Sequence, residues 1–525
     1  MTDSLQAAGS SADPLRERTG TSKASSAADA FPAPVYRDTV LEQVFNDAKR
    51  YFLGPLLEIE YAHTLMLAHQ DIVPADEAGR CLRALDALDR TELRDARYDG
   101  SFEDLFFLVE HKLALLCGSE TAGKMHTARS RNDIDLTMYR LVLRDGLLDF
   151  LSAQLALRGR LVELAWQNRA ALMPAYTHNQ PAQPTTLGHY LMAYVEVLER
   201  DAERVTAAYV RLNRSPLGAC AITTTGFPID RHMTARLLGF DGLQVNSYGA
   251  IASVDYVTES ASVLAVAMVS LGRFAQDLLL WSTAEFNYLR LSDAFVQISS
   301  IMPQKRNPVP LEHVRVLASR ALFGAHGVLG CLHNTPFADM NDAEDDLQPK
   351  VYGAFEDGLR SLRLLTGVLD TAEFNTGRMA AAAEGNFLPV TELADTLVRT
   401  CDISFHAAHH VVSTAVRELN AAGYSYDPET MALTIEHLLR NTLPNARPIS
   451  RAQILTSLRP DHFVAVRTVP GGPALEALEP EIQRARGQLA RDTSWVSAKR
   501  EALALAHTEL HRQCNALSSG TPILA

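Results

Sequence analysis

Two adjacent serines, a lysine, an arginine and an asparagine fall within the ten residues from Ser299 to Pro308, which also hold two prolines. Each proline removes a backbone donor and biases the residue before it away from the helical region, so a loop is expected here. Lys305 and Arg306 can neutralise a carboxylate, Asn307 can donate and accept, and a serine hydroxyl beside such cations can become a proton acceptor. Taken alone, these residues fit an ordinary surface loop equally well.

Two further segments gather polar side chains just before a predicted helix. His126 to Asp133 places hydroxyl, guanidinium and amide groups at a helix N-terminus, where free backbone amides favour an anion. Tyr176 to Thr186 also leads into a helix, and its His178 is the group best suited to proton transfer. The alternatives are that Asn132 or Asp133 only caps its helix, and that the histidine is structural.

Long helices must position these segments. Apolar residues at three-to-four spacing and the lack of proline predict one helix over Asp133 to Met173, of roughly eleven turns. Two more are predicted over Thr186 to Leu212 and over Asp255 to about Ser282. The predicted core positions are Leu136, Tyr139, Leu143, Leu147, Phe150 and Leu151 in the first helix, and Leu264, Met268, Leu271 and Phe274 in the third. The pattern indicates a mainly α protein built on an elongated bundle.

Composition narrows the class of protein. The 525 residues are 47% apolar and 21% charged, which is typical of a globular chain of more than one domain or subunit. The net charge of −13 argues against a nucleic-acid-binding surface. The longest uncharged apolar run of the chain, Ser260 to Gly272, is too short to cross a bilayer, so no membrane span is predicted.

The cysteines and the N-terminus indicate a compartment. The six cysteines are far apart with no paired short spacing, which suggests neither a zinc site nor a disulfide framework and favours a reducing cytoplasm. Residues 1–31 are rich in Ser, Ala, Thr and Asp and lack a signal-peptide core, so a disordered tail is predicted.

The three polar segments together resemble the argininosuccinate lyase branch of the fumarase/aspartase superfamily. Ser299 to Pro308 resembles the superfamily signature loop, His126 to Asp133 the SRND region of the branch, and Thr177 to Pro184 its threonine-histidine region. The stretches Gly226 to Arg231 and Thr391 to Asp395 are also similar. This similarity is specific to the branch.

The resemblance implies a three-domain, mainly α subunit whose long helices form a homotetramer, with each active site built from three subunits. The domains expected after the tail are an N-terminal helical domain at 32–130, a central long-helix bundle at 131–385 and a C-terminal helical domain at 386–525. Members eliminate fumarate from a substituted succinate without a metal or organic cofactor. The implied partner is therefore a small N-substituted aspartate.

The resemblance also assigns roles. Ser299 would be the general base that removes a proton from carbon, with its pKa lowered by Lys305 and backbone amides. Lys305 and Asn307 would stabilise the carbanion, whose charge spreads into the adjacent carboxylate. His178 would handle protons around the leaving amine. The residues implied to hold the succinyl carboxylates are Ser130, Arg131, Asn132, Thr177 and Gln180.

The chain departs from the branch in the segments that would contact the amine half of the substrate. Val254 replaces an arginine of the family, Gly249 replaces an aspartate, and the acidic stretch Asp339 to Asp346 replaces a Gln-Glu-Asp-Lys motif. If that stretch lines the pocket, a cationic leaving amine is favoured; otherwise it is a solvated loop. Argininosuccinate is the default substrate, an ethylenediamine-disuccinate-like aminopolycarboxylate is the rival, and a catalytically silent, crystallin-like homologue is the alternative of another class.

Overall fold

The computed structural model describes residues 31–423 and 426–520. Residues 1–30 of the predicted tail lie outside this part of the chain. The N-terminal helices are α1 (Pro34–Tyr36), the π-helical turn η1 (Arg37–Leu41), α2 (Glu42–Tyr51), α3 (Leu53–His69), α4 (Ala75–Ala87), α5 (Arg90–Asp95), α6 (Leu105–Cys117) and α7 (Ser119–Lys124).

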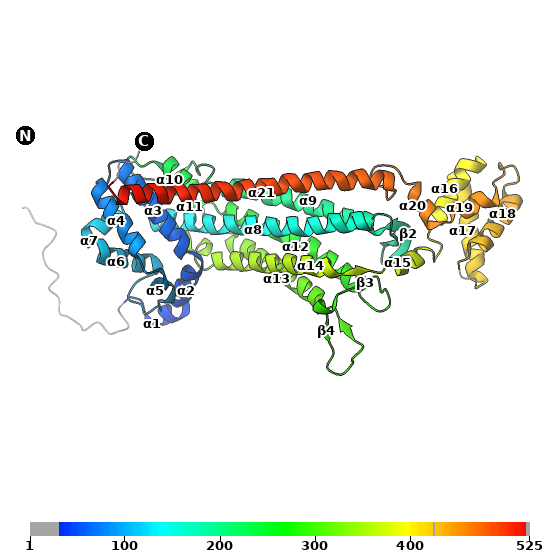
Figure 1. The fold of residues 1–525 in the computed structure, drawn as a ribbon, viewed down its shortest axis with the longest axis horizontal. Coiled ribbons are helices and arrows are strands. Elements are labelled where there is room, and N and C mark those ends of the chain that lie inside the picture. The colour runs from blue at the N-terminus through cyan, green and yellow to red at the C-terminus, as the bar shows by residue number, and fades with distance from the viewer. Residues whose placement is uncertain (1–30, 424–425, 521–525) are drawn as a thin grey trace, which may run out of the picture.

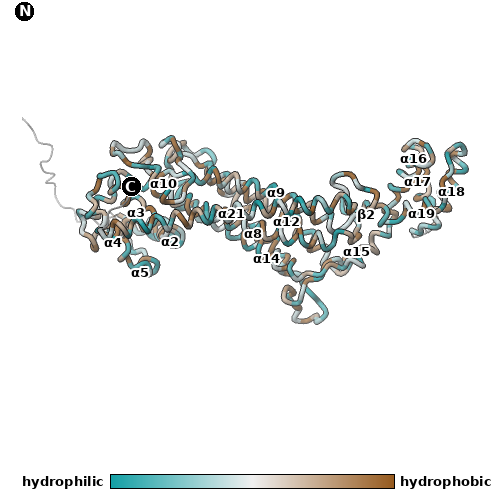
Figure 2. Tube along the Cα trace, turned by 45° about the horizontal axis from the view of Figure 1, so that its top comes forward, coloured by the Kyte–Doolittle hydropathy of each residue, from teal (hydrophilic) through white to brown (hydrophobic). Residues whose placement is uncertain are grey.

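Five long helices form the centre of the molecule: α8 (Arg131–Gln167), α9 (Leu187–Leu212), α12 (Asp255–Trp281), α13 (Val309–Leu332) and α14 (Gln348–Thr371). Helix α8 packs against α9 and α14, and α12 packs against α13 and α9. All ten predicted core positions of α8 and α12 are buried. The mainly α fold and the central bundle are confirmed, and Figure 2 shows hydrophobic and hydrophilic residues interspersed along these helices.

Short elements connect and flank the bundle. They are α10 (Arg231–Leu237), α11 (Ser247–Ala252), α15 (Thr376–Ala383), η2 (Asp293–Phe295) and η3 (Asn341–Ala343). The strands form three antiparallel pairs: β1 (Leu172–Thr177) with β2 (Gln180–Thr186), β3 (Leu289–Arg290) with β6 (Glu373–Phe374), and β4 (Gln297–Ile298) with β5 (Arg306–Asn307).

The first long helix ends earlier than predicted. Its expected last turn, up to Met173, instead starts the β1–β2 hairpin. The start of α9 crosses the end of α8 so closely that a Cβ on Gly188 would lie 2.6 Å from the Cα of Arg169. Helical periodicity could not show this crossing, because it is a contact between segments.

The C-terminal part has a core of its own and a long return. Helices α16 (Val390–Cys401), α17 (Phe405–Ala421), α18 (Pro428–Thr442), α19 (Arg451–Ser457) and α20 (Pro460–Ala465) lie at one end. Apolar residues of α16 to α19 form a separate cluster. Helix α21 (Leu475–Ser518) runs back along the bundle to α3 and α4 (Figure 1). The division of the chain into the expected domains stays a prediction.

One described helix, α12, is long and apolar enough by composition to cross a bilayer, and half of its most apolar window is buried in the bundle. A core helix of a helical bundle passes the same test, which makes this weak support for a membrane span.

Candidate active site

The Ser299 hydroxyl lies at the start of a loop that joins β4 to β5. Its Oγ accepts hydrogen bonds from the backbone N–H groups of Ile301 and Met302, at 3.3 and 3.0 Å. Backbone donors aimed at an oxygen favour its negatively charged form. The geometry therefore suits a serine that must act as a proton acceptor.

The other predicted residues of this loop shape its base. Asn307 lies opposite Gln297 in the β4–β5 pair, and its Nδ2 donates to the Gln297 carbonyl at 3.0 Å. The Lys305 backbone N–H donates to the Met302 carbonyl at 3.0 Å, which closes a turn within the loop. Arg306 pairs with Asp293 and donates to the Leu291 carbonyl. The loop is thus anchored on the chain before β4.

The loop between β4 and β5 projects from the side of the bundle (Figure 1). Ile298 and Ile301 are 80% and 83% exposed, and Met302 is 43% exposed. Burying such side chains is favourable, so an exposed apolar tip beside a candidate base is typical of a surface that another molecule covers.

Thr177, His178 and Gln180 lie together at the tip of the β1–β2 hairpin. His178 and Asn179 form a two-residue turn with φ of 54° and 58°, and Thr177 pairs with Gln180 across it. Two consecutive left-handed residues are what a type I′ hairpin turn requires. The side chains of the turn are exposed, so all three predicted residues are available to a ligand.

Ser130, Arg131 and Asn132 lie at the N-terminus of α8, as predicted. Ser130 is the N-cap residue, and its backbone N–H donates to the Asp133 carboxylate at 2.9 Å. The other oxygen of Asp133 accepts from the Gly218 and Cys220 backbones at 2.7 and 2.9 Å. Ser130 and Asp133 therefore form a capping box, in which the Ser130 side chain also accepts from the Asp133 backbone N–H, so the capping role that was the simpler alternative is filled by Asp133 together with Ser130.

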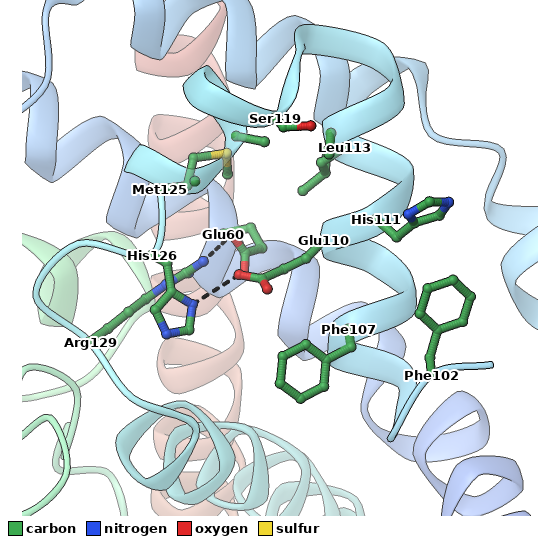
Figure 3. Close-up of a pocket in the computed structure, with 13 residues that line it drawn as sticks. Glu60, Phe102, Phe107, Glu110, His111, Leu113, Ser119, Met125, His126 and Arg129 are labelled. Carbon is green, nitrogen blue, oxygen red and sulfur yellow. Dashed lines mark hydrogen bonds and ion pairs between the residues drawn. The ribbon is translucent and has the colours of Figure 1, made fainter. Parts of the chain in front are cut away.

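Polar side chains of α3 and α6 hold the segment that precedes Ser130. Arg129 donates from Nη2 to Glu60 Oε2 at 2.8 Å, with both side chains 1% exposed. His126 contacts Glu110 at 2.9 Å, and Figure 3 shows both pairs beside the same pocket. His63 donates from Nε2 to the Thr127 carbonyl at 2.8 Å. These contacts fix the chain just before Ser130.

Carboxylates surround the side chains that were predicted to bind carboxylates. Arg131 pairs with Asp104 and also contacts Glu103 at 3.2 Å. Asn132 donates to Asp339 of the acidic stretch. Part of that stretch therefore faces the predicted site and is not a solvated loop.

This acidic neighbourhood is crowded enough to shift pKa values. Burial and the nearby Asp339 raise the pKa of Glu344 to about 8. Burial and the charges of Asp345 and Asp104 raise the pKa of Asp135 well above its usual value. Burial is the larger cause of both shifts, and the repulsion between neighbouring carboxylates that adds to it would be relieved by a bound cation.

Two members of this neighbourhood were missed in the sequence. Tyr139 was assigned to the apolar stripe of its helix, and it is buried, but its hydroxyl donates to Asp345 at 2.6 Å. Asp135 lies in the second turn of α8, and its position two residues after Asp133 was the available signal. Their role depends on segments brought together by the fold.

A single chain does not bring the three predicted segments together. Arg131 starts α8 and the hairpin follows its far end, so the 37 residues of the helix separate them by ~55 Å. Figure 1 shows the two ends of the bundle far apart. Among the described residues, no hydrogen bond or ion pair joins one segment to another.

Two family models match the chain. The family described as Lyase matches residues 66–323, and Argininosuccinate lyase C-terminal matches residues 387–465. A class II fumarase from Schistosoma mansoni shares the fold, with a TM-score of 0.64 at 13% identity over 82% of this chain and 92% of its own. Fold and matches together define a lyase of the fumarase/aspartase superfamily.

Individual relatives narrow the class. Argininosuccinate lyase 2 of Agrobacterium fabrum is 40% identical over 91% of this chain and 97% of its own length. Argininosuccinate lyase of Methanococcoides burtonii is 35% identical over 85% and 89%. A solved EDDS lyase variant with bound fumarate is 33% identical, with a TM-score of 0.82 over 93% and 96%. The chain belongs to the argininosuccinate lyase family, whose members are carbon–nitrogen lyases.

Proposed function

We propose that this protein eliminates fumarate from an N-substituted L-aspartate, with argininosuccinate as the default substrate and arginine as the second product. The two relatives named argininosuccinate lyase match 91% and 85% of this chain. The observation that carries the proposal is the Ser299 hydroxyl, whose oxygen accepts two backbone hydrogen bonds at the start of the signature loop. The cytoplasmic location stays a prediction, which the six unpaired cysteines support.

Ser299 acts as the base in an anti β-elimination. It removes the proton from the carbon next to one succinyl carboxylate, and the resulting negative charge spreads into that carboxylate. Lys305 and Asn307 stabilise this charge more in the transition state than in the ground state, which is what accelerates the step. The electron pair then forms the carbon–carbon double bond of fumarate as the carbon–nitrogen bond breaks.

The remaining predicted residues bind the succinyl group or transfer a proton to the leaving amine. Thr177, Gln180 and the segment Ser130 to Asn132 hold the carboxylates of the succinyl group, and His178 manages the proton around the departing amine. The exposure of the hairpin tip supports this assignment, since its side chains are free to meet a substrate.

The active site is shared between subunits of a homotetramer. One chain keeps Arg131 and Thr177 ~55 Å apart, so a substrate can meet both only if they come from different copies. Exposed apolar residues of the bundle helices support such packing: Val266 and Val269 in α12, and Val316 and Phe323 in α13. Ile301, in the loop between β4 and β5, is also exposed, and contact with another subunit would bury it.

A second candidate substrate is an aminopolycarboxylate such as ethylenediamine-disuccinate. The acidic residues around Arg131 and Asn132 favour a cationic amine, and the solved EDDS lyase is a relative at 33% identity. A diamine-bearing leaving group and the guanidinium of arginine both meet that requirement. Both substrates contain the succinyl group, so the residues proposed to bind that group are the same for each.

Fumarate absorbance with purified protein tests the proposal. Argininosuccinate and ethylenediamine-disuccinate are supplied separately. In the reverse direction, fumarate is incubated with arginine and with diamines, and the adducts are identified by mass spectrometry. Turnover of argininosuccinate confirms the default, and turnover of the other substrate alone confirms the rival. If the protein releases fumarate from no N-substituted aspartate, it is a catalytically silent homologue.

A further inference from the structure

Three metal-ligating side chains converge where the end of α21 meets α3. They are Glu58 of α3 and His507 and His511 of α21. One donor atom from each lies within 4.8 Å of the other two, and no other such group of three His, Cys, Asp or Glu occurs among residues 31–423 and 426–520. None of the three is assigned to the lyase reaction.

The two histidines are spaced for joint coordination. Residues four apart on a helix lie one turn above each other on the same face, and a His-x-x-x-His pair on a helix is a recurrent zinc-binding arrangement. Their rings lie 4.4 Å apart between centroids. Tyr61 packs against the His511 ring at 4.9 Å, which helps to hold its orientation.

The carboxylate of Glu58 faces both rings. His507 Nδ1 lies 3.1 Å from Oε2, and His511 Nε2 lies 3.1 Å from Oε1. Adjacent ligand atoms around a tetrahedral zinc ion are about 3.3 Å apart, given metal–ligand distances near 2.0 Å. Each imidazole nitrogen therefore already lies near the separation from the carboxylate that a shared ion requires, and all three donors lie within 4.8 Å of one another.

We propose that Glu58, His507 and His511 bind a divalent transition-metal ion that clips the end of α21 to α3. Two imidazoles and one carboxylate suit zinc, nickel or cobalt, whereas magnesium and calcium prefer oxygen ligands. Each ring binds through the nitrogen that faces Glu58 and carries its proton on the other nitrogen. His507 is 60% exposed, so water completes the coordination.

The clip joins segments that are far apart in the sequence. Helix α3 also carries Glu60 and His63, which hold the chain before Ser130. An ion at Glu58 therefore fastens the C-terminal helix to the helix that supports the candidate substrate-binding segment. Its role is structural, because no predicted catalytic residue is among its ligands.

Zinc titration of the full-length protein tests the site. The untagged chain is freed of metal with a chelator and titrated with zinc chloride in a calorimeter, as wild type and as Glu58→Gln and His507→Asn variants. We expect one ion per chain, and a loss of affinity of about tenfold or more in each variant. Circular dichroism checks that both variants stay folded.

A matched control comes from α17. His406 and His410 are also four residues apart on an exposed helix face, but they belong to no group of three ligands. The His406→Asn/His410→Asn double variant should keep the wild-type affinity. Wild-type binding in the Glu58 and His507 variants, equal loss in the control, or no binding by the wild type would overturn the proposal.

Hydrogen exchange supplies a second readout. Zinc should slow amide exchange in the last turns of α21 in the wild type, and have no such effect in Glu58→Gln. Exchange that slows equally in both proteins would contradict a clip at these residues.

Discussion

Ser299 and Ser300 are adjacent, yet their surroundings differ. Two backbone N–H groups converge on the Ser299 oxygen, and among the described hydrogen bonds none is made by the Ser300 hydroxyl. Residue type alone made both serines candidates for the proton acceptor. The loop conformation distinguishes them, because it directs fixed dipoles at one oxygen only.

Replacing Ser299 by Ala should lower the rate of fumarate release by about 10²–10⁴-fold, the contribution typical of a general base, and leave the assembly intact. The Ser300→Ala variant is the control and should keep most of the activity. Steady-state absorbance assays and light scattering measure the two effects. Near-normal turnover by Ser299→Ala would remove that residue as the base.

His63 is a buried histidine that the lyase reaction does not use. Burial and the charge of Arg129 lower its pKa to about 3. The unfolded chain binds a proton near pH 6.5, whereas the folded chain does not until about pH 3. The stability that this residue contributes is therefore complete above about pH 6.5 and is lost as the pH falls toward 3.

The His63→Gln variant should show a weaker loss of stability on acidification, because glutamine has no proton to take up and its amide can still donate to the Thr127 carbonyl. The difference in slope against pH should be at most about 1.4 kcal/mol per pH unit for each chain. Urea unfolding between pH 7 and pH 5 measures it. Parallel curves for the two proteins would contradict the assignment.

At the scale of elements, the buried Arg129–Glu60 pair joins α3 to the segment before α8. Within the described residues, Glu60 Oε1 and Arg129 Nε and Nη1 have no hydrogen-bond partner. Such a pair gains little over an apolar contact, but losing one partner leaves an uncompensated buried charge. The pair therefore fixes position more than it adds stability.

Arg129→Met should cost about 3–5 kcal/mol of unfolding free energy, since it strands the Glu60 carboxylate. The exposed Arg50–Glu356 pair is the matched control, with side chains 60% and 49% exposed. Arg50→Met should cost less than about 1 kcal/mol. Chemical unfolding measures both, and equal losses would mean that burial of the pair is not what matters.

The elements also show what periodicity could predict. The apolar stripes of α8 and α12 were correct at every position, because a helix face is determined by local spacing. The hairpin between α8 and α9 was missed, since its strands are short and carry three prolines, Pro174, Pro181 and Pro184. Pairing between the strands decided that local structure.

At the scale of the whole molecule, the length of the bundle separates the parts of the proposed site. Arg131 and the hairpin tip occupy opposite ends of a helix ~55 Å long. The proposed site, which needs both, would therefore be completed by residues from other copies in the proposed homotetramer. A mixture of subunits with different defects can therefore contain sites that carry neither defect.

Mixing the inactive variants Ser299→Ala and Arg131→Met, followed by dissociation and reassembly, should restore a measurable fraction of wild-type activity. Each mixed assembly can hold a site that takes Ser299 from one chain and Arg131 from another, both intact. Two preparations of Ser299→Ala treated in the same way are the control and should stay inactive. No recovery in the mixture would show that both residues serve one site from a single chain.

The sequence by itself indicated the mainly helical fold through local periodicity, and its resemblance to a family, carried by three polar segments in a particular order, indicated the family and the candidate catalytic residues. The tertiary structure decided how those residues are surrounded. It directs two backbone amides at Ser299, places Arg131 and Asn132 among carboxylates, and brings Glu58 to the two histidines of α21. These arrangements join segments far apart in the chain, so no local pattern records them.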